Sequence, residues 1–540
     1  MLMPHMVTPD ATKAWLMTDC CEAFDVIVVG AGISGGLPAA AYLQKAGCSV
    51  AVVERDKDGA PFSSSYERPP GVRFDVTPVN FSIMSPAVAD LDLGAYGYRF
   101  DRPDILYSTR DGAGRAITFF ADPAKLKEEL ARYSPADASA FVRILSGLGD
   151  AARALLSAVF FTPTPDKARA LALTAAAVGI EASELESMNA PALVERLFES
   201  DAVRIAVTAL PAINLFGDLL SPGQGALAWL WTFLMRACTL SRDDPTLSQA
   251  VERAFLAHGG VLLKGATVTR LLRDADGRCG GVEFESAGAR KVLKARLGVI
   301  SDLGADLTSS LLQEPLRPEW RSASRTVFTA DVVLNRPLAW ISNEFRRSPR
   351  VYLLWDSWSD CVRWLHAARN EQEDVFLGHI ELTQFSNCYG CAPDGSAALR
   401  VRFGTGPFLD PDWRARRQFY EDAVRERIRK LDPDAVVRSL ELRTPAEYWE
   451  WNPAARHGNP VGGDFVDGQW LGQRLPYRTS TPGLYMSNSV WPTSLSWMAP
   501  GYNVAKVVAA DVGLTLPSWW SSTPIPSFNL ASKAPLGGAC

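Results

Sequence analysis

The segment from residue 24 to 54 constrains the fold more than any other part of the chain. Asp25–Val29 and Ser49–Val53 are short apolar runs rich in β-branched residues, which is typical of strands buried in a parallel sheet. Ala39–Ala46 lies between them and predicts a helix, and Gly47 follows it in the usual position of a C-terminal cap. The order strand, helix, strand within about thirty residues is that of a βαβ unit, which predicts an α/β fold.

The turn between the first strand and the helix carries glycines with the spacing GxGxxG. Gly30 permits a tight turn, Gly32 lets the backbone approach a pyrophosphate, and Gly35 lets the helix pack close to the strand. The start of the helix also presents unpaired N–H groups to phosphates. Glu54 ends the second strand, where a carboxylate accepts hydrogen bonds from ribose hydroxyls and disfavours a 2′-phosphate. We therefore predict a dinucleotide site at this turn.

The same turn fits a second pattern. Gly32–Gly36 matches the Gly-x-Ser-x-Gly pattern of a nucleophile elbow, which would make Ser34 a nucleophile. Bound phosphate would occupy that backbone, and Glu54 favours the dinucleotide interpretation, so we place Ser34 in the phosphate loop. The sequence contains no HExxH, P-loop or EF-hand motif.

Length and composition indicate a globular protein with more than one domain. A chain of 540 residues exceeds what a single hydrophobic core normally organises. Hydrophobic residues make up 47% and charged residues 21%, which is ordinary for a globular protein. The formal net charge of -5 gives no support to nucleic-acid binding, which usually needs a basic face.

Cysteine usage and hydropathy lead us to expect a cytoplasmic protein. The nine cysteines are scattered, and the only CxxC pair, Cys388 and Cys391, lacks the second ligand pair of a zinc site. We therefore predict no metal. Residues 1–23 lack the pattern of a secretory signal, and no apolar run reaches the roughly 20 residues of a membrane-spanning helix. Peripheral contact with a membrane surface is left open.

The stretch from about 120 to 240 is predicted to be rich in helices. Small and apolar residues are prominent in it, which fits either an ordinary helical core or a substrate cap with a membrane-facing surface. The predicted helices are Leu126–Ala131, Ala136–Leu148, Ala151–Phe160, Ala168–Val178 and Pro191–Phe198.

Strands predominate in the predictions for the rest of the chain. Thr246–His258 and Trp413–Lys430 predict helices, and Asp276 with Gly277 marks a hairpin turn. The predicted strands are Val261–Lys264, Ala266–Leu272, Gly281–Glu285, Gly298–Ser301, Thr326–Leu334, Val351–Trp355, Val375–Glu381 and Ala398–Phe403.

Several segments together resemble the phytoene desaturase and carotenoid isomerase family of flavoproteins, which belongs to the amine-oxidase-like superfamily. The resemblance covers most of the chain, and its most specific motifs lie near the two ends. The segments are 24–54, Gly71–Pro78, His258–Val268 with Gly280–Val282, Asn452–Pro453 with Gly472–Arg474 and Thr481–Met486, and Ala499–Lys506.

The resemblance implies an α/β fold in which a Rossmann-type FAD-binding domain is assembled from non-adjacent segments, beside a mixed α+β substrate domain and a helix-rich cap. The FAD-binding segments would be 24–120, 241–323 and 461–515, the cap 121–240, the substrate domain 324–460 and a tail 516–540. FAD is the expected cofactor, with Val268 holding its adenine end through the backbone. The expected FAD contacts are Gly30, Gly32, Ile33, Ser34, Gly35, Glu54, Arg55, Val268, Asn488, Pro500, Gly501, Tyr502 and Asn503.

The segment Val490–Met498 departs from the family pattern. Bulky residues stand there where the family has glycine-rich backbone beside the flavin. We therefore expect Trp491, Trp497 and Met498 to line a reshaped substrate pocket. For the tryptophans, simple packing is an equal alternative.

Few side chains are candidates for proton transfer. His379 and Glu381 lie two residues apart on a predicted strand, so both can face one side and act together as a general base. The alternative is an uninvolved pair on a strand face. Tyr502 precedes the last helix and could reach the flavin or the substrate, and Asp464 is a weaker candidate.

The resemblance implies an FAD-dependent oxidoreductase that removes hydride from a carbon of an apolar or aromatic small molecule, as a desaturase, dehydrogenase or oxidase. Two alternatives remain: a redox-neutral isomerase that uses reduced FAD, and a non-catalytic protein that retains FAD. The sequence determines neither the electron acceptor, with oxygen and quinone as options, nor the oligomeric state.

Overall fold

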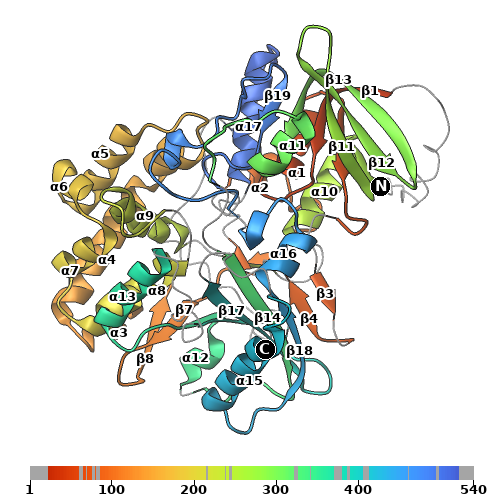
Figure 1. Ribbon diagram of the computed structural model, residues 1–540. Coiled ribbons are helices and arrows are strands. Elements are labelled where there is room, and N and C mark those ends of the chain that lie inside the picture. The colour runs from red at the N-terminus through yellow and green to blue at the C-terminus, as the bar shows by residue number, and fades with distance from the viewer. Residues whose placement is uncertain are drawn as a thin grey trace, which may run out of the picture.

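Two seven-stranded sheets and a group of helices dominate the described part of the chain (Figure 1). In the orientation of Figure 1 the first sheet lies at the upper right, the second lies below it, and the helices cover the left-hand side. The computed structural model describes residues 22–59, 65–67, 70–75, 79–80, 85–213, 217–236, 239–241, 246–321, 326–340, 342–369, 380–385, 390–405, 413–459, 461–493 and 498–521.

The first sheet contains the predicted βαβ unit. Its strand order is β10-β2-β1-β13-β12-β11, and β19 pairs with β13. β10, β2, β1, β13 and β19 pair in parallel, whereas β11, β12 and the first half of β13 form an antiparallel meander. The strands are β1 Glu22–Val29, β2 Val50–Glu54, β10 Val261–Lys264, β11 Ala266–Arg273, β12 Cys279–Ser286, β13 Ala289–Ser301 and β19 Leu484–Met486.

Alternate residues of β1 and β2 face opposite sides of this sheet, and both sides are covered. Val26 and Val52 pack in the cluster that holds residues of α1 (Gly36–Lys45), α10 (Leu247–Ala257) and α17 (Ala499–Asp511). Ile27 and Val53 pack in a separate cluster with Leu311 and Leu312 of α11 (Ala305–Leu312). Coverage of both faces explains why the two strands are apolar throughout, and the predicted βαβ unit is confirmed.

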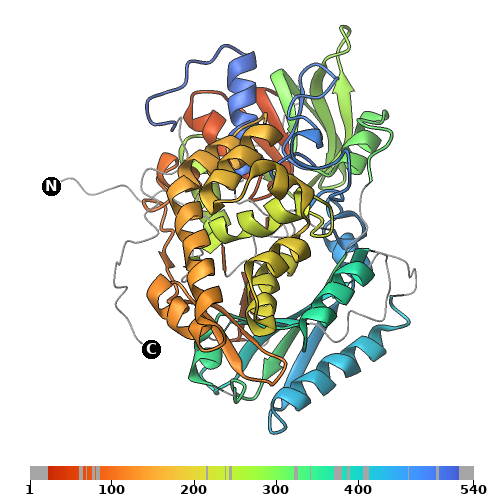
Figure 2. The same ribbon diagram turned by 90° about the vertical axis from the view of Figure 1, so that its left-hand side faces the viewer.

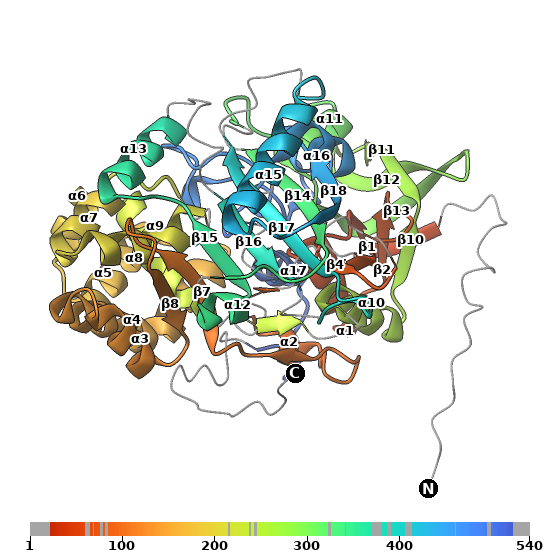
Figure 3. The same ribbon diagram turned by 90° about the horizontal axis from the view of Figure 1, so that it is seen from below.

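The second sheet has the order β18-β14-β17-β16-β15-β7-β8. Its neighbours are antiparallel except for β15 and β7, which pair in parallel. Tyr420, Val424 and Ile428 of α15 pack against Phe328 and Leu442 of the sheet, and Figure 3 shows α15 lying across it. The elements are β7 Ile105–Arg110, β8 Ala116–Phe120, β14 Thr326–Leu334, β15 Arg350–Leu353, β16 Ile380–Gln384, β17 Ala397–Thr405, β18 Val437–Arg443 and α15 Arg417–Leu431.

Most helices of the predicted helix-rich stretch gather on one side of the molecule (Figure 2). The prediction of separate helices at 136–148 and 151–160 is wrong, because α4 runs unbroken and continues as a π-helical turn, Leu156–Phe160. Position 147, inside α4, requires glycine because a Cβ there would collide with the carbonyl of Ala177 on α5. The helices are α3 Pro123–Ala131, α4 Pro135–Leu155, α5 Lys167–Val178, α6 Ala182–Ser187, α7 Ala190–Leu197, α8 Asp201–Ile213 and α9 Gln224–Thr232.

Short elements connect these three parts. The predicted strand Val375–Glu381 is described only from Ile380 on, and it continues as β16 to Gln384. The remaining elements are β3 Ser65–Glu67, β4 Arg73–Asp75, β5 Val79–Asn80, β6 Phe100–Asp101, β9 Thr239–Ser241, α2 Ala87–Asp90, α12 Asn343–Arg347, α13 Trp358–Arg369 and α16 Pro445–Trp451.

Candidate functional site

The glycine loop lies between β1 and α1, at the carboxyl end of the parallel strands. Gly30 has φ +94°, which few other residues adopt, and it turns the chain from the strand into the loop. A Cβ at Gly32 or Gly35 would collide with the carboxylate oxygens of Asp302. The loop therefore needs its glycines because an acidic group approaches its backbone closely.

Asp302 directly follows β13, the strand beside β1. Its amide donates to the carbonyl of Val29 at 2.9 Å. Its carboxylate accepts hydrogen bonds from the amides of Gly32 and Gly36 and from the Ser487 hydroxyl at 2.8 Å. Burial raises the pKa of Asp302 to about 7, against the effect of these hydrogen bonds. The amides of the loop thus bind the carboxylate of Asp302, and the same N–H donors suit a phosphate.

Glu54 lies at the end of β2, as predicted, and is 6% exposed. Its carboxylate accepts hydrogen bonds from the amides of Ala31 at 2.8 Å and Asp56 at 2.9 Å. Burial raises the pKa of Glu54 despite these two donors. Arg55 donates to the carbonyl of Trp451 at 2.6 Å, so the chain after β2 is tied to the end of helix Pro445–Trp451, which follows the second sheet.

The residues that follow β19 reach the same loop. The amide of Gly501, at the start of α17, donates to the carbonyl of Ser34 at 3.0 Å, and Pro500 is buried beside it. The side-chain amide of Asn488 donates to the carbonyl of Asp302 at 3.2 Å. The structure therefore brings the predicted residues Ser34, Asn488, Pro500 and Gly501 together, although they come from opposite ends of the chain.

Other predicted cofactor residues lie around this loop or farther along α17. Ile33 is buried in the loop, and Val268 is half-buried on β11 opposite Phe284 of β12. The Asn503 side chain donates to the carbonyl of Phe160 at 2.9 Å and to the Tyr477 hydroxyl at 3.0 Å, so it ties α17 to the π-helical turn that follows α4. The FAD contacts of these residues stay predictions.

The predicted catalytic residues are separated. Tyr502 is fully buried with its ring 5.6 Å from that of Tyr42, and its hydroxyl donates to the carbonyl of Ser521. His379 lies outside the described residues. Glu381 pairs with Tyr352 and Arg402 on the neighbouring strands, and its side chain is outside the description. Their catalytic roles stay predictions.

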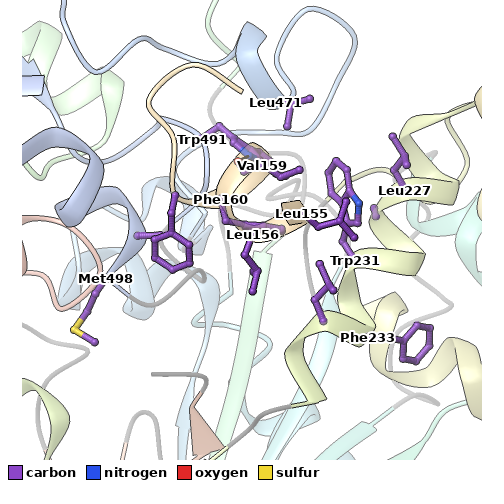
Figure 4. Packing of buried hydrophobic residues seen from close by; sticks show 14 of the residues in the cluster. Leu155, Leu156, Val159, Phe160, Leu227, Trp231, Phe233, Leu471, Trp491 and Met498 are labelled. Carbon is purple, nitrogen blue, oxygen red and sulfur yellow. Dashed lines mark hydrogen bonds between the residues drawn. The ribbon is translucent and has the colours of Figure 1, made fainter. Parts of the chain in front are cut away.

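Trp491 lies beside the π-helical turn Leu156–Phe160 (Figure 4). Its ring is 5.9 Å from Phe160 and 5.9 Å from Trp470, and its Nε1 donates to the carbonyl of Val159 at 2.8 Å. Met498 is buried at the start of α17, and Trp497 lies outside the described residues. In the described structure the contacts of Trp491 are those of tight packing, and the substrate-pocket role of the three residues stays a prediction.

A pocket of about 330 Å³ opens beside the Asp302 end of the loop. Ser489 lies in its wall, and the Ser489 hydroxyl accepts a hydrogen bond from the amide of Ala305, the first residue of α11. Its lining includes Gly304, Gly462 and Gly463, the aromatic residues Trp320 and Trp449, and the basic residue Arg456.

The glycine pair in this pocket is a part of the site that the sequence analysis missed. Gly462 has φ +67° and Gly463 has φ +122°. A Cβ at Gly462 would collide with the Asn488 side chain, and one at Gly463 would collide with the Trp320 ring. The sequence did not identify Gly462 and Gly463 as pocket residues, because glycine pairs are common in ordinary loops.

Arg474 binds backbone carbonyls next to and within the glycine pair. The sequence analysis did not predict this role either. The side chain is 3% exposed, and its Nη2 donates to the carbonyls of Val461 and Gly462 at 3.0 Å each. Its Nε donates to the carbonyl of Val490 at 3.0 Å. Burial lowers the pKa of Arg474 to about 9. The guanidinium thus joins the loop around Gly462 to the segment that leads into α17.

The described residues contain neither a side-chain cluster suited to a metal ion nor a helix suited to crossing a membrane. In those residues no group of three or more His, Cys, Asp or Glu side chains could hold a metal ion. Cys391 is free and exposed, and Cys388 lies outside the description. No described helix is long and apolar enough to cross a bilayer.

Comparisons with known proteins agree with this geometry. A model of the NAD(P)-binding Rossmann-like domain matches residues 28–91. The chain is 24% identical to a limonene dehydrogenase polypeptide of Castellaniella defragrans, over 92% of this chain and 96% of that protein. Cyclohexylamine oxidase from Brevibacterium oxydans has a similar fold, with a TM-score of 0.54 and 18% identity over 91% of this chain and 99% of that one. A putrescine oxidase variant also has a similar fold, with a TM-score of 0.55 and 15% identity over 92% of this chain and 100% of that one.

The fold and the glycine loop define an α/β protein with a Rossmann-type dinucleotide site. The chain is similar in sequence to the limonene dehydrogenase polypeptide and in fold to the two amine oxidases, in line with the flavoprotein resemblance that the sequence implies.

Proposed function

We propose that the chain is an FAD-dependent oxidoreductase that removes hydride from a carbon atom of an apolar small molecule. The observation that carries the proposal is the glycine loop, which binds the carboxylate of Asp302 through the amides of Gly32 and Gly36. An amide cradle of this kind at the start of a helix suits the pyrophosphate of a dinucleotide. Glu54, at the end of β2, supports a dinucleotide without a 2′-phosphate.

FAD, when bound, supplies the hydride acceptor, and the protein supplies binding, orientation and exclusion of water. Gly30–Gly36 would hold the pyrophosphate, and Glu54 the ribose. The pocket beside Asp302 would receive the next part of the cofactor, because Gly304, Asn488 and Ser489 connect it to the loop. Arg474 would keep the pocket's glycine pair in position by binding its carbonyls.

The proposed substrate is an apolar cyclic alkene or a molecule of similar size. The support is the likeness to the limonene dehydrogenase polypeptide, which extends over 92% of this chain. The junction of the cap with the C-terminal segment is also aromatic, with Phe160, Trp231, Trp470 and Trp491 in contact. These four rings are buried against one another, so the junction excludes water.

The test is an anaerobic reduction experiment on the purified full-length protein. We expect flavin absorbance, and we expect limonene or a related cyclic alkene to bleach it while putrescine and cyclohexylamine do not. Oxygen or a quinone is then added, and peroxide formation in air identifies an oxidase. If no donor bleaches the flavin but the pre-reduced protein isomerises an alkene, the proposed reaction is wrong and a redox-neutral isomerase replaces it.

A further inference from the structure

One acidic side chain occupies the place where the glycine loop offers its amides. The carboxylate of Asp302 accepts hydrogen bonds from the amides of Gly32 and Gly36 and from the hydroxyl of Ser487. Its oxygens lie so close to the loop that a Cβ at Gly32 or Gly35 would overlap them. A dinucleotide pyrophosphate needs these same amides. Two anionic groups therefore compete for one set of donors.

The surroundings of Asp302 contain another acid and no cation to offset it among the described residues. The loop Gly30–Gly36 has no ionisable side chain, and Ser487 and Asn488 at the end of β19 are neutral. Glu54, on β2, faces Asp302 and raises its pKa.

Two basic side chains of neighbouring segments have other partners. Arg55 binds Asp56 and the carbonyl of Trp451, and Arg456 pairs with Asp306 of α11 at 3.0 Å. Bringing a pyrophosphate into this site would place its charges beside two carboxylates. Protonation of one carboxylate removes much of that repulsion.

We propose that Asp302 couples dinucleotide binding to proton uptake: the cofactor's phosphates bind as Asp302 takes a proton from solvent and becomes a neutral acid. This inference rests on the proposed function, since it assumes that the loop binds FAD. It goes further by assigning to Asp302 a role as a proton-linked positioning residue. No bond other than the O–H bond of the acid is formed.

The direction of the pH effect follows from the charges. Burial already places the pKa of Asp302 at about 7, and the nearby phosphates raise it further in the complex. Below pH 7 the acid is neutral before and after binding, so FAD affinity is independent of pH. Above pH 7 the free protein must take up a proton, so affinity falls by up to about tenfold for each pH unit.

The experiment is a titration of the full-length protein, freed of cofactor, with FAD between pH 6 and pH 8.5, followed by flavin fluorescence. For the unmodified protein we expect the Kd to rise by about tenfold or more over this range. Calorimetry at pH 8 in two buffers of different ionisation enthalpy should show uptake of about one proton. Asp302→Asn keeps the shape of the side chain and should bind FAD with a Kd that does not change with pH.

Asp25→Asn is the control, because Asp25 is a carboxylate that pairs with Arg296 at 2.8 Å on the part of β1 farther from the loop. It should keep the pH dependence of the unmodified protein. The inference is overturned if the Kd of the unmodified protein for FAD does not change with pH and no proton is taken up. It is also overturned if the Kd of Asp302→Asn rises with pH as steeply as that of the unmodified protein, a result that would point to Glu54. If Asp302→Asn does not fold, proton uptake that persists in Glu54→Gln supports Asp302, and uptake that is lost in Glu54→Gln overturns the inference. Absence of FAD binding at every pH contradicts the proposed function itself.

Discussion

The amide of Gly501 donates a hydrogen bond of 3.0 Å to the carbonyl oxygen of Ser34, and this bond joins the last helix to the loop that follows the first strand. A side chain at Gly501 would have no space, because its Cβ would lie 2.5 Å from the carbonyl of Gly35 and 2.8 Å from the Cβ of Pro38. α1 and α17 can therefore cross here only at a glycine.

Replacing Gly501 by alanine should push α17 away from the glycine loop. We expect Gly501→Ala to lower the free energy of unfolding by about 1–3 kcal/mol and to release bound flavin during purification. Gly94→Ala is the control, since a Cβ at Gly94 meets nothing within 4 Å. Equal flavin content and equal unfolding midpoints for the two variants would show that the crossing is not constrained.

Removing the Arg474 guanidinium should unlock the loop around Gly462. Arg474→Met leaves buried carbonyls without donors, so we expect a loss of at least about 3 kcal/mol in denaturant unfolding. Arg478→Met is the matched control: Arg478 is an exposed arginine that binds Asp511, and its loss should cost less than about 1 kcal/mol. The interpretation of Arg474 is wrong if both variants unfold at the same denaturant concentration.

The segment after α17 should contribute to stability through Trp520. Its ring is 4% exposed and lies 4.8 Å from the ring of Tyr42 on α1. We expect Trp520→Ala to cost about 3–5 kcal/mol, the usual effect of removing a buried tryptophan. Leu516→Ala should change little, because Leu516 is 40% exposed. Thermal unfolding of the two variants provides the comparison, and similar midpoints would contradict the packing role of Trp520.

The protein without cofactor should become less stable between pH 4 and pH 7 because of Asp302. The pKa of this acid is raised from 3.8 to about 7 on folding, so the folded state binds the proton more tightly than the unfolded state. The stabilising effect is complete below pH 3.8 and is lost as pH rises to 7, by about 1.4 kcal/mol per pH unit for this group alone.

Asp302→Asn removes this group from the titration, so the unfolding free energy of the variant should exceed that of the unmodified protein at pH 8. Chemical unfolding at pH 5 and at pH 8 measures the difference between the two proteins. A difference that is the same at both values would show that Asp302 does not titrate in this range.

The sequence predicted the parts of the fold that rest on local patterns. β1, α1 and β2 follow from apolar runs and glycine spacing, and Val261–Lys264 and Thr326–Leu334 have the bounds that the sequence predicts. The break predicted between Leu148 and Ala151 was wrong, because α4 runs without interruption from Pro135 to Leu155. Gly147, inside this helix, serves the close approach of α5 and no turn. A glycine that serves a long-range contact looks the same in sequence as one that ends a helix.

The sequence predicted the glycine loop and Glu54 of the candidate site, but not Asp302 or Arg474. The glycine loop and Glu54 carry their own signature, whereas Asp302 meets the loop only after the sheet has formed. One signal was available for Asp302: it directly follows an apolar strand, where side chains of parallel sheets gather around ligands. Arg474 had no such signal, because its hydrogen bonds go to backbone carbonyls that any sequence provides.

The most direct test of the account is the identity and amount of the cofactor that the purified protein holds. The protein is denatured, and the released small molecules are separated and identified by their absorbance and mass. We predict FAD at about one molecule per chain for the unmodified protein and far less for Gly32→Trp, whose side chain would fill the phosphate loop. Release of a nicotinamide dinucleotide, or full FAD content in Gly32→Trp, would contradict the assignment of this loop as the FAD site.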